Sequence, residues 1–197
     1  MQPAIEQFRV NVSRVRSLGS LRSAIENQTT AALDLSDILR AQLVLAVSAL
    51  DDFVHEEVRQ GMMEIWRGRR IETPSFKRFP VSLENVRLAA FPGDDWLQTE
   101  IRLHHNWRSF QRSENIAEAI RLISDLRIWD EVANHLGRPA NETRERLDLI
   151  VERRNKIAHE ADIDPTRPGE RWPIDQKLVD DAIDFIEKVC EAINRVI

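Results

Sequence analysis

Apolar residues recur at spacings of three and four along most of the chain, which is the period of a helix with one buried face. Ile5, Phe8 and Val12 begin the first such stripe, and Gly19 is expected to break the helix that carries it. A longer stripe with no internal proline predicts one continuous helix over residues 36–67. Strand-like alternation is missing from the sequence, so the pattern predicts an all-α fold.

Capping and helix-breaking residues divide the remainder of the chain into further helices. The expected N-terminal caps are Ser82, Asp94 or Asp95, Ser113, Asn141 and Asp175. The second of these helices is expected to run to about Gln111. Residues 162–173 contain too many prolines and glycines to be helical and separate the last helix from the others. We therefore expect a bundle of about six or seven helices.

Length and composition favour one domain. The chain has 197 residues, 42% of them hydrophobic, which is enough for a core that buries roughly 70% of the surface of the unfolded chain. A single domain over residues 1–197 is expected. The formal net charge of -5 is mild, so affinity for nucleic acid would have to come from a local basic patch. The basic loop that contains Arg69 and Arg70 is a weak candidate for RNA contact.

Cysteine content and hydropathy bear on the compartment. Cys190 is the only cysteine, so the sequence offers no intramolecular disulfide and no thiolate zinc cluster. A reducing compartment suits such a chain, and we expect a cytoplasmic location. The first residues lack the basic segment and apolar run of a secretory signal, and no apolar run is long enough to span a bilayer. Neither a membrane nor a cofactor is an expected partner.

The segment Arg153–Glu160 carries the side chains with the clearest chemical potential. Histidine, with an ordinary pKa of about 6.5, can accept or donate a proton at cellular pH. These residues suit cleavage of RNA by its own 2′-hydroxyl, with His159 as general acid or base and Arg154 stabilising charge on the phosphorane. Asn155 would orient the imidazole or a phosphate oxygen. None of these roles requires a metal.

Two further cations of the segment, Arg153 and Lys156, are expected to strengthen RNA binding electrostatically. The helical period limits how the main candidates can meet. Asn155 and His159 are four residues apart and share a face, whereas Arg154 and His159 are five apart and diverge by about 140°. Either the helix is distorted there, or the two side chains meet one substrate from two copies of the chain across a dimer axis. We favour the second account.

A structural interpretation of the same side chains remains open. Arg154 would then pair with an acid such as Asp52, and His159 would be a satisfied polar residue at the end of a buried helix. Asp51, Asp52 and His55 are secondary site candidates, although acids at such positions more often form a solvated helix face.

The adjacent pair His104 and His105 suggests a metal site at first sight. Neighbouring positions on a helix point about 100° apart, so the two side chains cannot share one metal ion without ligands from elsewhere. No metal site is predicted.

The run from Arg154 to His159 resembles the Rx4-6H motif of the HEPN superfamily, in which a polar residue, here Asn155, typically follows the arginine. The segment Ser48–His55 in a long early helix, the motif and a closing helix together resemble the RiboL-PSP-HEPN branch. The similarity covers most of the chain.

This resemblance implies a helical bundle that forms a homodimer, with both motifs at the interface. It also implies metal-independent endoribonuclease activity, a role in toxin or antiviral defence systems, and an antitoxin or defence-system partner. Arg154, Asn155 and His159 would inherit the active-site roles. Some HEPN toxins carry a tyrosine two residues after the histidine that a partner modifies. Here that position is Ala161 and the chain has no tyrosine, which excludes this form of neutralisation.

Two other functions compete with the nuclease. One is a catalytically silent HEPN module that binds RNA, a nucleotide or a partner protein, because the sequence contains no other catalytic equipment. The other is a purely structural helical adaptor. In that case, replacing Arg154 or His159 by alanine changes neither RNA binding nor toxicity on overexpression.

Overall fold

The computed structural model describes residues 2–28, 33–89, 93–167 and 169–197. These residues form eight α-helices, one short 3-10 helix and no strand, so the all-α prediction is confirmed. The elements are α1 (Ala4–Glu26), α2 (Ser36–Trp66), η1 (Phe76–Arg78), α3 (Leu83–Leu88), α4 (Asp95–His105), α5 (Ser113–Ile120), α6 (Ile128–Leu136), α7 (Ala140–Glu160) and α8 (Gln176–Val196).

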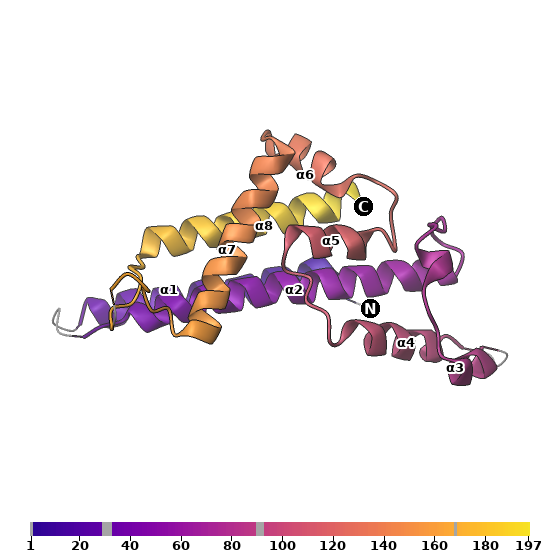
Figure 1. Ribbon diagram of the computed structural model, residues 1–197, viewed down its shortest axis with the longest axis horizontal. Coiled ribbons are helices and arrows are strands. Elements are labelled where there is room, and N and C mark those ends of the chain that lie inside the picture. Colours follow the sequence, from indigo (N-terminus) through magenta and orange to yellow (C-terminus); the bar gives the residue numbers. More distant parts are fainter. Residues whose placement is uncertain (1, 29–32, 90–92, 168) are drawn as a thin grey trace.

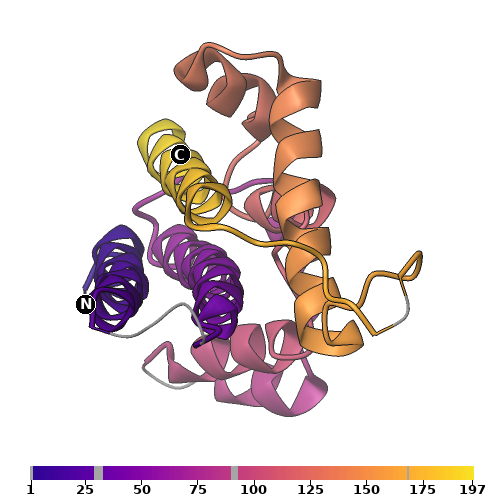
Figure 2. The same ribbon diagram turned by 90° about the vertical axis from the view of Figure 1, so that its left-hand side faces the viewer.

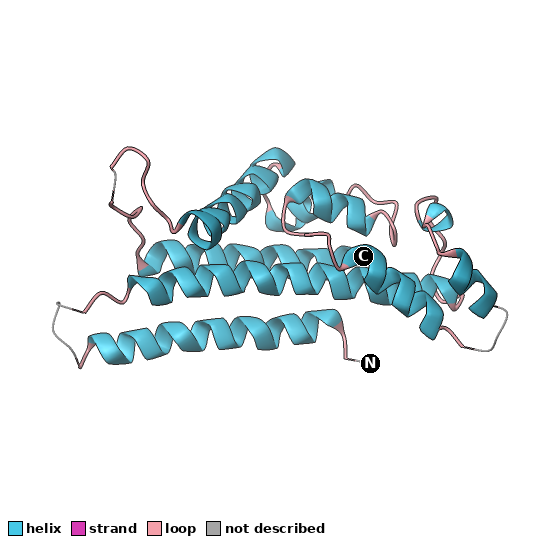
Figure 3. Cartoon of the chain, turned by 60° about the horizontal axis from the view of Figure 1, so that its bottom comes forward, coloured by secondary structure: helices cyan, strands magenta, loops and turns pink. Residues whose placement is uncertain are grey.

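Three long helices, α1, α2 and α8, lie side by side along the length of the molecule (Figures 1 and 3). Figure 2 shows these three nearly end-on, with α7 crossing beside them at a steep angle. α2 is the central helix, because it packs against α1, α4, α5, α7 and α8. Consecutive residues Ala46 and Val47, and Ala49 and Leu50, are buried, so α2 is covered on several sides. The helices that pack against α2 are therefore all positioned by this one helix.

Gly19 lies inside α1 and does not break it, contrary to expectation. A Cβ atom added there would stand 2.8 Å from Nε2 of Gln42 on α2. That Nε2 donates a hydrogen bond to the main-chain oxygen of Val15 at 3.1 Å. The glycine thus allows α1 and α2 to approach closely. The other residues of α1 stabilise the helix enough to offset the low helix propensity of one glycine.

The predicted caps had mixed outcomes. Ser82 and Asp175 are the caps of α3 and α8, and each accepts a hydrogen bond from a backbone N–H of the first turn. The prediction for Ser113 is wrong: α5 begins at Ser113 itself, and its hydroxyl donates to Asp148 on α7 at 2.7 Å. Asn141 is also no cap, since α7 begins one residue earlier behind Pro139. At α5 the carboxylate of Asp148 accepts from both the backbone N–H and the hydroxyl of Ser113, whereas at α7 Pro139 is in the N-cap position and forms no side-chain capping hydrogen bond.

α4 ends at His105, well before the expected end at Gln111. The side chain of Gln111 instead donates a hydrogen bond to Oδ2 of Asp51 at 2.9 Å. The backbone N–H of Phe110 donates to Oδ1 of the same carboxylate at 2.6 Å. Residues 106–111 are thus held against α2 as a loop, because the half-buried carboxylate of Asp51 accepts one hydrogen bond from the backbone and one from a side chain of this segment. Ala90 and Pro92, where we expected α3 to end, lie outside the described residues.

The chain leaves α7 through Asp162, whose side chain is completely buried. Oδ2 of Asp162 accepts hydrogen bonds from Nε of Arg40 on α2 at 2.8 Å and from Nη2 of Arg153 on α7 at 2.9 Å. Both guanidinium groups also donate to the main-chain oxygen of Trp172, just before α8. Ala161 and Asp162 have φ values of 52° and 61°, so the turn after α7 is left-handed. This ion cluster ties α2, the end of α7 and the entry to α8 together.

Asp162→Asn is expected to lower the free energy of unfolding by about 3 kcal/mol, because removing one charge of a buried cluster leaves the others uncompensated. Asparagine tolerates the left-handed backbone conformation, so the loss reports on charge and not on strain. The measurement is urea denaturation followed by circular dichroism. Asp184→Asn is the control. Asp184 pairs with Arg16 at the exposed surface, and its loss should cost less than about 1 kcal/mol. Equal stability of the two variants would contradict the structural role of Asp162.

Candidate functional site

The segment Arg153–Glu160 forms the last two turns of α7, which is an unbroken α-helix through Glu160. A distorted helix can therefore no longer explain how Arg154 and His159 meet. On a regular helix their side chains point about 140° apart. One copy of the segment does not aim both groups at one substrate.

Arg154 is half-buried where α7 packs against α2. Its Nη1 donates a hydrogen bond to Oδ1 of Asn155 at 2.9 Å, and its buried Nε has no hydrogen-bond partner among the described residues. Burial lowers the pKa of Arg154, and the nearby charge of Asp51 opposes that shift. An arginine with such a shift still carries its charge near neutral pH. Arg154 is thus a partly desolvated cation with unused donor capacity.

The other members of the motif segment differ in exposure and in whether another side chain already holds them. His159 is exposed in the last turn of α7. Nζ of Lys156 lies 3.2 Å from a carboxylate oxygen of Glu152 one turn earlier. Arg153 is held by Asp162, and burial is the main cause that lowers its pKa. Arg153 therefore has a structural partner already, and the remaining candidates for RNA contact here are Arg154, Asn155 and His159, with Lys156 at the edge.

The secondary candidates lie on α2 and face in different directions. Asp51 anchors residues 106–111 and is the acid whose charge acts on Arg154, where we had named Asp52. Asp52 accepts a hydrogen bond from Asn11 on α1 at 3.4 Å, and burial with the adjacent Glu56 charge raises the pKa of Asp52. Asp51 therefore belongs to the neighbourhood of the motif, whereas Asp52 belongs to the contact with α1.

His55 lies one turn after Asp51 on α2. Its Nε2 is 3.2 Å from the main-chain oxygen of Arg108 and 3.7 Å from Oδ1 of Asp51. His55 thus supports the loop that Asp51 anchors.

The basic loop after α2 does not act as one patch. Arg67 pairs with Asp94, and Lys77 pairs with Glu72. Nη2 of Arg70 donates to the main-chain oxygen of Ile197 at 2.6 Å. Arg69 is exposed. Because α2 rises about 22 Å between Asp51 and its end at Trp66, Arg69 and Arg70 lie far from the motif within one chain.

His105 is buried with 4% of its surface exposed and packs among aromatic rings, with ring centres 5.2 Å from Phe110 and 6.2 Å from His55. Burial is the main cause that lowers the pKa of His105 to about 4, and the positive charges of His55, Arg108 and His104 act in the same direction. His104 lies 3.4 Å from a carboxylate oxygen of Glu100, and both histidines contact the ring of Phe79, with ring centres 5.2 and 5.9 Å away. The two histidines therefore pack against a shared aromatic partner.

Within the part of the chain that the structure describes, no three His, Cys, Asp or Glu side chains gather in a way that could hold a metal ion. None of the described helices is long and apolar enough to cross a membrane.

Fold and site together define a helical bundle whose penultimate helix ends in an arginine-polar-x3-histidine motif beside a central helix. The profile of the RiboL-PSP-HEPN family matches residues 10–197, and the chain belongs to this family. Neither a curated protein nor a solved structure matches the chain. Family membership supports an RNase-type or other RNA-related function.

Sequence reasoning did not identify Asp162 or its partner Arg40, although one signal was present. Arg40 lies between Leu39 and Leu43 on the buried stripe of α2, and a charged residue at such a position needs a buried counter-ion. Nothing in the sequence near Arg40 indicates that this counter-ion follows 122 positions later.

His105 makes the protein sensitive to acid. Because its pKa is about 4 in the folded protein and about 6.5 in the unfolded chain, the unfolded chain binds more protons between these values. Folding stability must therefore fall as the pH drops from about 6.5 to about 4. Over this pH interval, we expect the free energy of unfolding to fall by about 1 to 3 kcal/mol less in the His105→Phe variant than in the wild type.

The measurement is urea denaturation of both proteins at several pH values in this interval. His135→Phe, at an exposed position of α6, controls for the loss of a histidine as such. A parallel decline of wild type and His105→Phe would contradict the assignment.

Proposed function

We propose that this protein is an endoribonuclease that needs no metal and acts as a homodimer. The observation that carries the proposal is the partly desolvated Arg154, hydrogen-bonded to Asn155, with His159 exposed one turn further along the same unbroken helix. Family membership supports an RNA substrate. A half-buried cation with free donors favours a phosphate, and an exposed imidazole favours proton transfer.

The reaction follows from these groups. His159 takes the proton from a 2′-hydroxyl of the RNA, and that oxygen attacks the adjacent phosphorus. Arg154 donates hydrogen bonds to the non-bridging oxygens as their charge increases, and Asn155 holds the guanidinium group in place. The bond from phosphorus to the 5′-oxygen breaks, and the imidazolium returns the proton to that oxygen. The products are a 2′,3′-cyclic phosphate and a 5′-hydroxyl.

A second copy completes the site in this proposal. The divergence of Arg154 and His159 on a regular helix is its physical reason, since a twofold axis beside α7 would set Arg154 of one chain against His159 of the other. Such an interface would also bring the two copies of Lys156 near the same RNA.

The cellular context that we propose is a toxin or defence system in the cytoplasm, with an antitoxin or defence-system partner. Expression of wild-type protein should then stop growth, and His159→Ala should relieve the arrest.

A catalytically silent RNA-binding module is the alternative. The position of Asp51 favours it, because this acid offsets part of the charge of Arg154 that a phosphorane would need. Saturable RNA binding without cleavage of varied RNAs would identify the silent module.

Cleavage of RNA by wild-type protein should continue in EDTA and leave cyclic phosphate ends. His159→Ala is expected to reduce the rate at least about 100-fold, since it removes the proton-transfer group. Arg154→Ala should reduce it by a similar factor, because it removes charge stabilisation in the transition state. The assay follows a labelled RNA on denaturing gels. Arg14→Ala, an exposed change on α1, is the control. Wild-type rates in nuclease-free preparations of His159→Ala would refute the mechanism.

Mixing the two inactive proteins tests the composite site. If Arg154 and His159 act across the interface, each heterodimer of Arg154→Ala with His159→Ala contains one intact site. Random exchange should then restore about a quarter of wild-type activity, because half of the dimers are mixed and each has one of two sites. Exchange is checked by copurification of one variant with an affinity-tagged copy of the other, and the dimer is checked by light scattering during size-exclusion chromatography. A monomer at micromolar concentration, or full exchange without recovery, would contradict the dimeric site.

A further inference from the structure

A cleft of about 450 Å³ opens between η1, the end of α4 and α5, away from the α7 motif. The volume is in the range of small ligand sites. Its lining includes Arg78, Phe79, His104, Trp107, Arg108 and Arg121. These residues come from three segments that are distant in sequence, so no linear motif marks the cleft.

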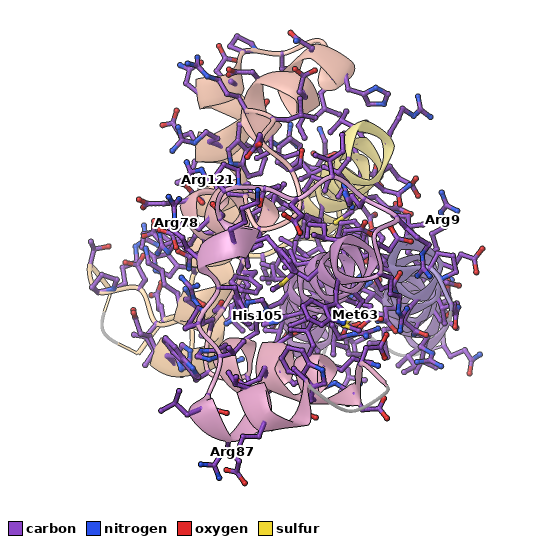
Figure 4. The ribbon with its side chains drawn as sticks, turned by 90° about the vertical axis from the view of Figure 1, so that its right-hand side faces the viewer. Arg9, Met63, Arg78, Arg87, His105 and Arg121 are labelled. Carbon is purple, nitrogen blue, oxygen red and sulfur yellow. The ribbon has the colours of Figure 1, made fainter. Side chains whose placement is uncertain are left out.

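The cleft has an excess of positive charge. Arg108 pairs with Glu118 at 2.8 Å. Arg78 and Arg121 are exposed, and among the described residues neither forms a side-chain ion pair or hydrogen bond. Figure 4 shows the labelled side chains of Arg78 and Arg121 on the same side of the molecule. Two unpaired guanidinium groups beside one cleft form a site for phosphates or carboxylates.

An exposed aromatic surface adjoins these cations. Trp107 is 77% exposed, an unusual condition for the largest apolar side chain. The guanidinium carbon of Arg108 lies 5.9 Å from the centre of its ring. Phe79 forms another wall of the cleft and contacts His104, with ring centres 5.2 Å apart. Flat rings beside arginines are the usual platform for unpaired bases.

We propose that this cleft binds a single-stranded segment of RNA, with one base stacked on Trp107 and the neighbouring phosphates held by Arg78 and Arg121. The proposal rests on the proposed function and adds a substrate-holding site outside the motif. An acidic protein segment could use the same arginines, but it would gain little from an exposed indole face. RNA accounts for both features.

The loop that carries Trp107 connects the cleft to the neighbourhood of the motif. It continues to Phe110 and Gln111, which Asp51 holds by two hydrogen bonds. Asp51 is also the acid whose charge acts on Arg154. The four Cα–Cα steps from Trp107 to Gln111 span at most roughly 14 Å. RNA held in the cleft would therefore lie close enough to extend along this loop toward α7.

Binding is best measured by fluorescence anisotropy with a labelled single-stranded 2′-O-methyl RNA. Such RNA lacks the hydroxyl that cleavage uses, so the measurement does not depend on catalysis. Trp107→Ala should raise Kd at least about fivefold through lost stacking, and Trp107→Phe should recover most of the affinity. The double variant Arg78→Ala/Arg121→Ala should raise Kd about tenfold and make the salt dependence shallower by about 1.4, for two lost contacts to single-stranded phosphates.

Arg87→Ala is the matched control, because Arg87 is an exposed arginine on α3 that points away from Arg78 and Arg121 (Figure 4). It should bind like wild type, and circular dichroism should show that all variants are folded. Unchanged Kd in Trp107→Ala and in the double arginine variant would overturn the proposal. Equal losses for a polyglutamate peptide, with no effect of Trp107→Ala on RNA, would assign the cleft to an acidic protein instead. Loss of RNA binding here without any cleavage by wild type would refute the nuclease and leave the RNA cleft standing.

Discussion

The buried carboxylate of Asp162 is the constraint on which the motif region depends. It lies between Arg40 of α2 and Arg153 of α7, at 2.8 and 2.9 Å, and both arginines also reach the backbone at Trp172. Charges so deeply buried are tolerated only with partners in good geometry. The cluster therefore determines where α7 ends, how the chain turns and where α8 begins.

Because of this ion cluster, the two adjacent arginines of the motif segment have different roles. Arg153 is committed to Asp162 and stabilises the fold, whereas Arg154, the next residue, is turned by 100° and remains free of ion pairs among the described residues. Neighbouring arginines with identical chemistry thus have separate roles because the helix sends them in different directions. The same helical geometry points Arg154 and His159 about 140° apart, which is why the proposed site needs a second chain.

The loop 106–111, which α2 holds in place, extends from the cleft toward the neighbourhood of the motif. Asp51 holds this loop through Phe110 and Gln111 and lies close enough to act on Arg154. His55 and His105 pack beneath the same loop. The proposed RNA path is thus supported by one helix.

Much of the protein was determined by the sequence alone. Periodic apolar residues predicted the long α2 and the all-α fold, and local capping chemistry predicted the starts of α3 and α8 at Ser82 and Asp175. The motif from Arg154 to His159 pointed to the family that its profile match then showed.

Tertiary structure decided the rest, because the partners are distant in sequence. Ser113 donates a hydrogen bond to Asp148 instead of capping a helix. Gly19 allows α1 and α2 to pack closely instead of ending α1. Residues 106–111 are held by Asp51 as a loop instead of continuing α4. The cleft around Trp107 is likewise assembled from three separate segments. Periodicity and capping are local properties that a sequence displays, whereas buried ion pairs and clefts depend on which surfaces meet once the helices have packed.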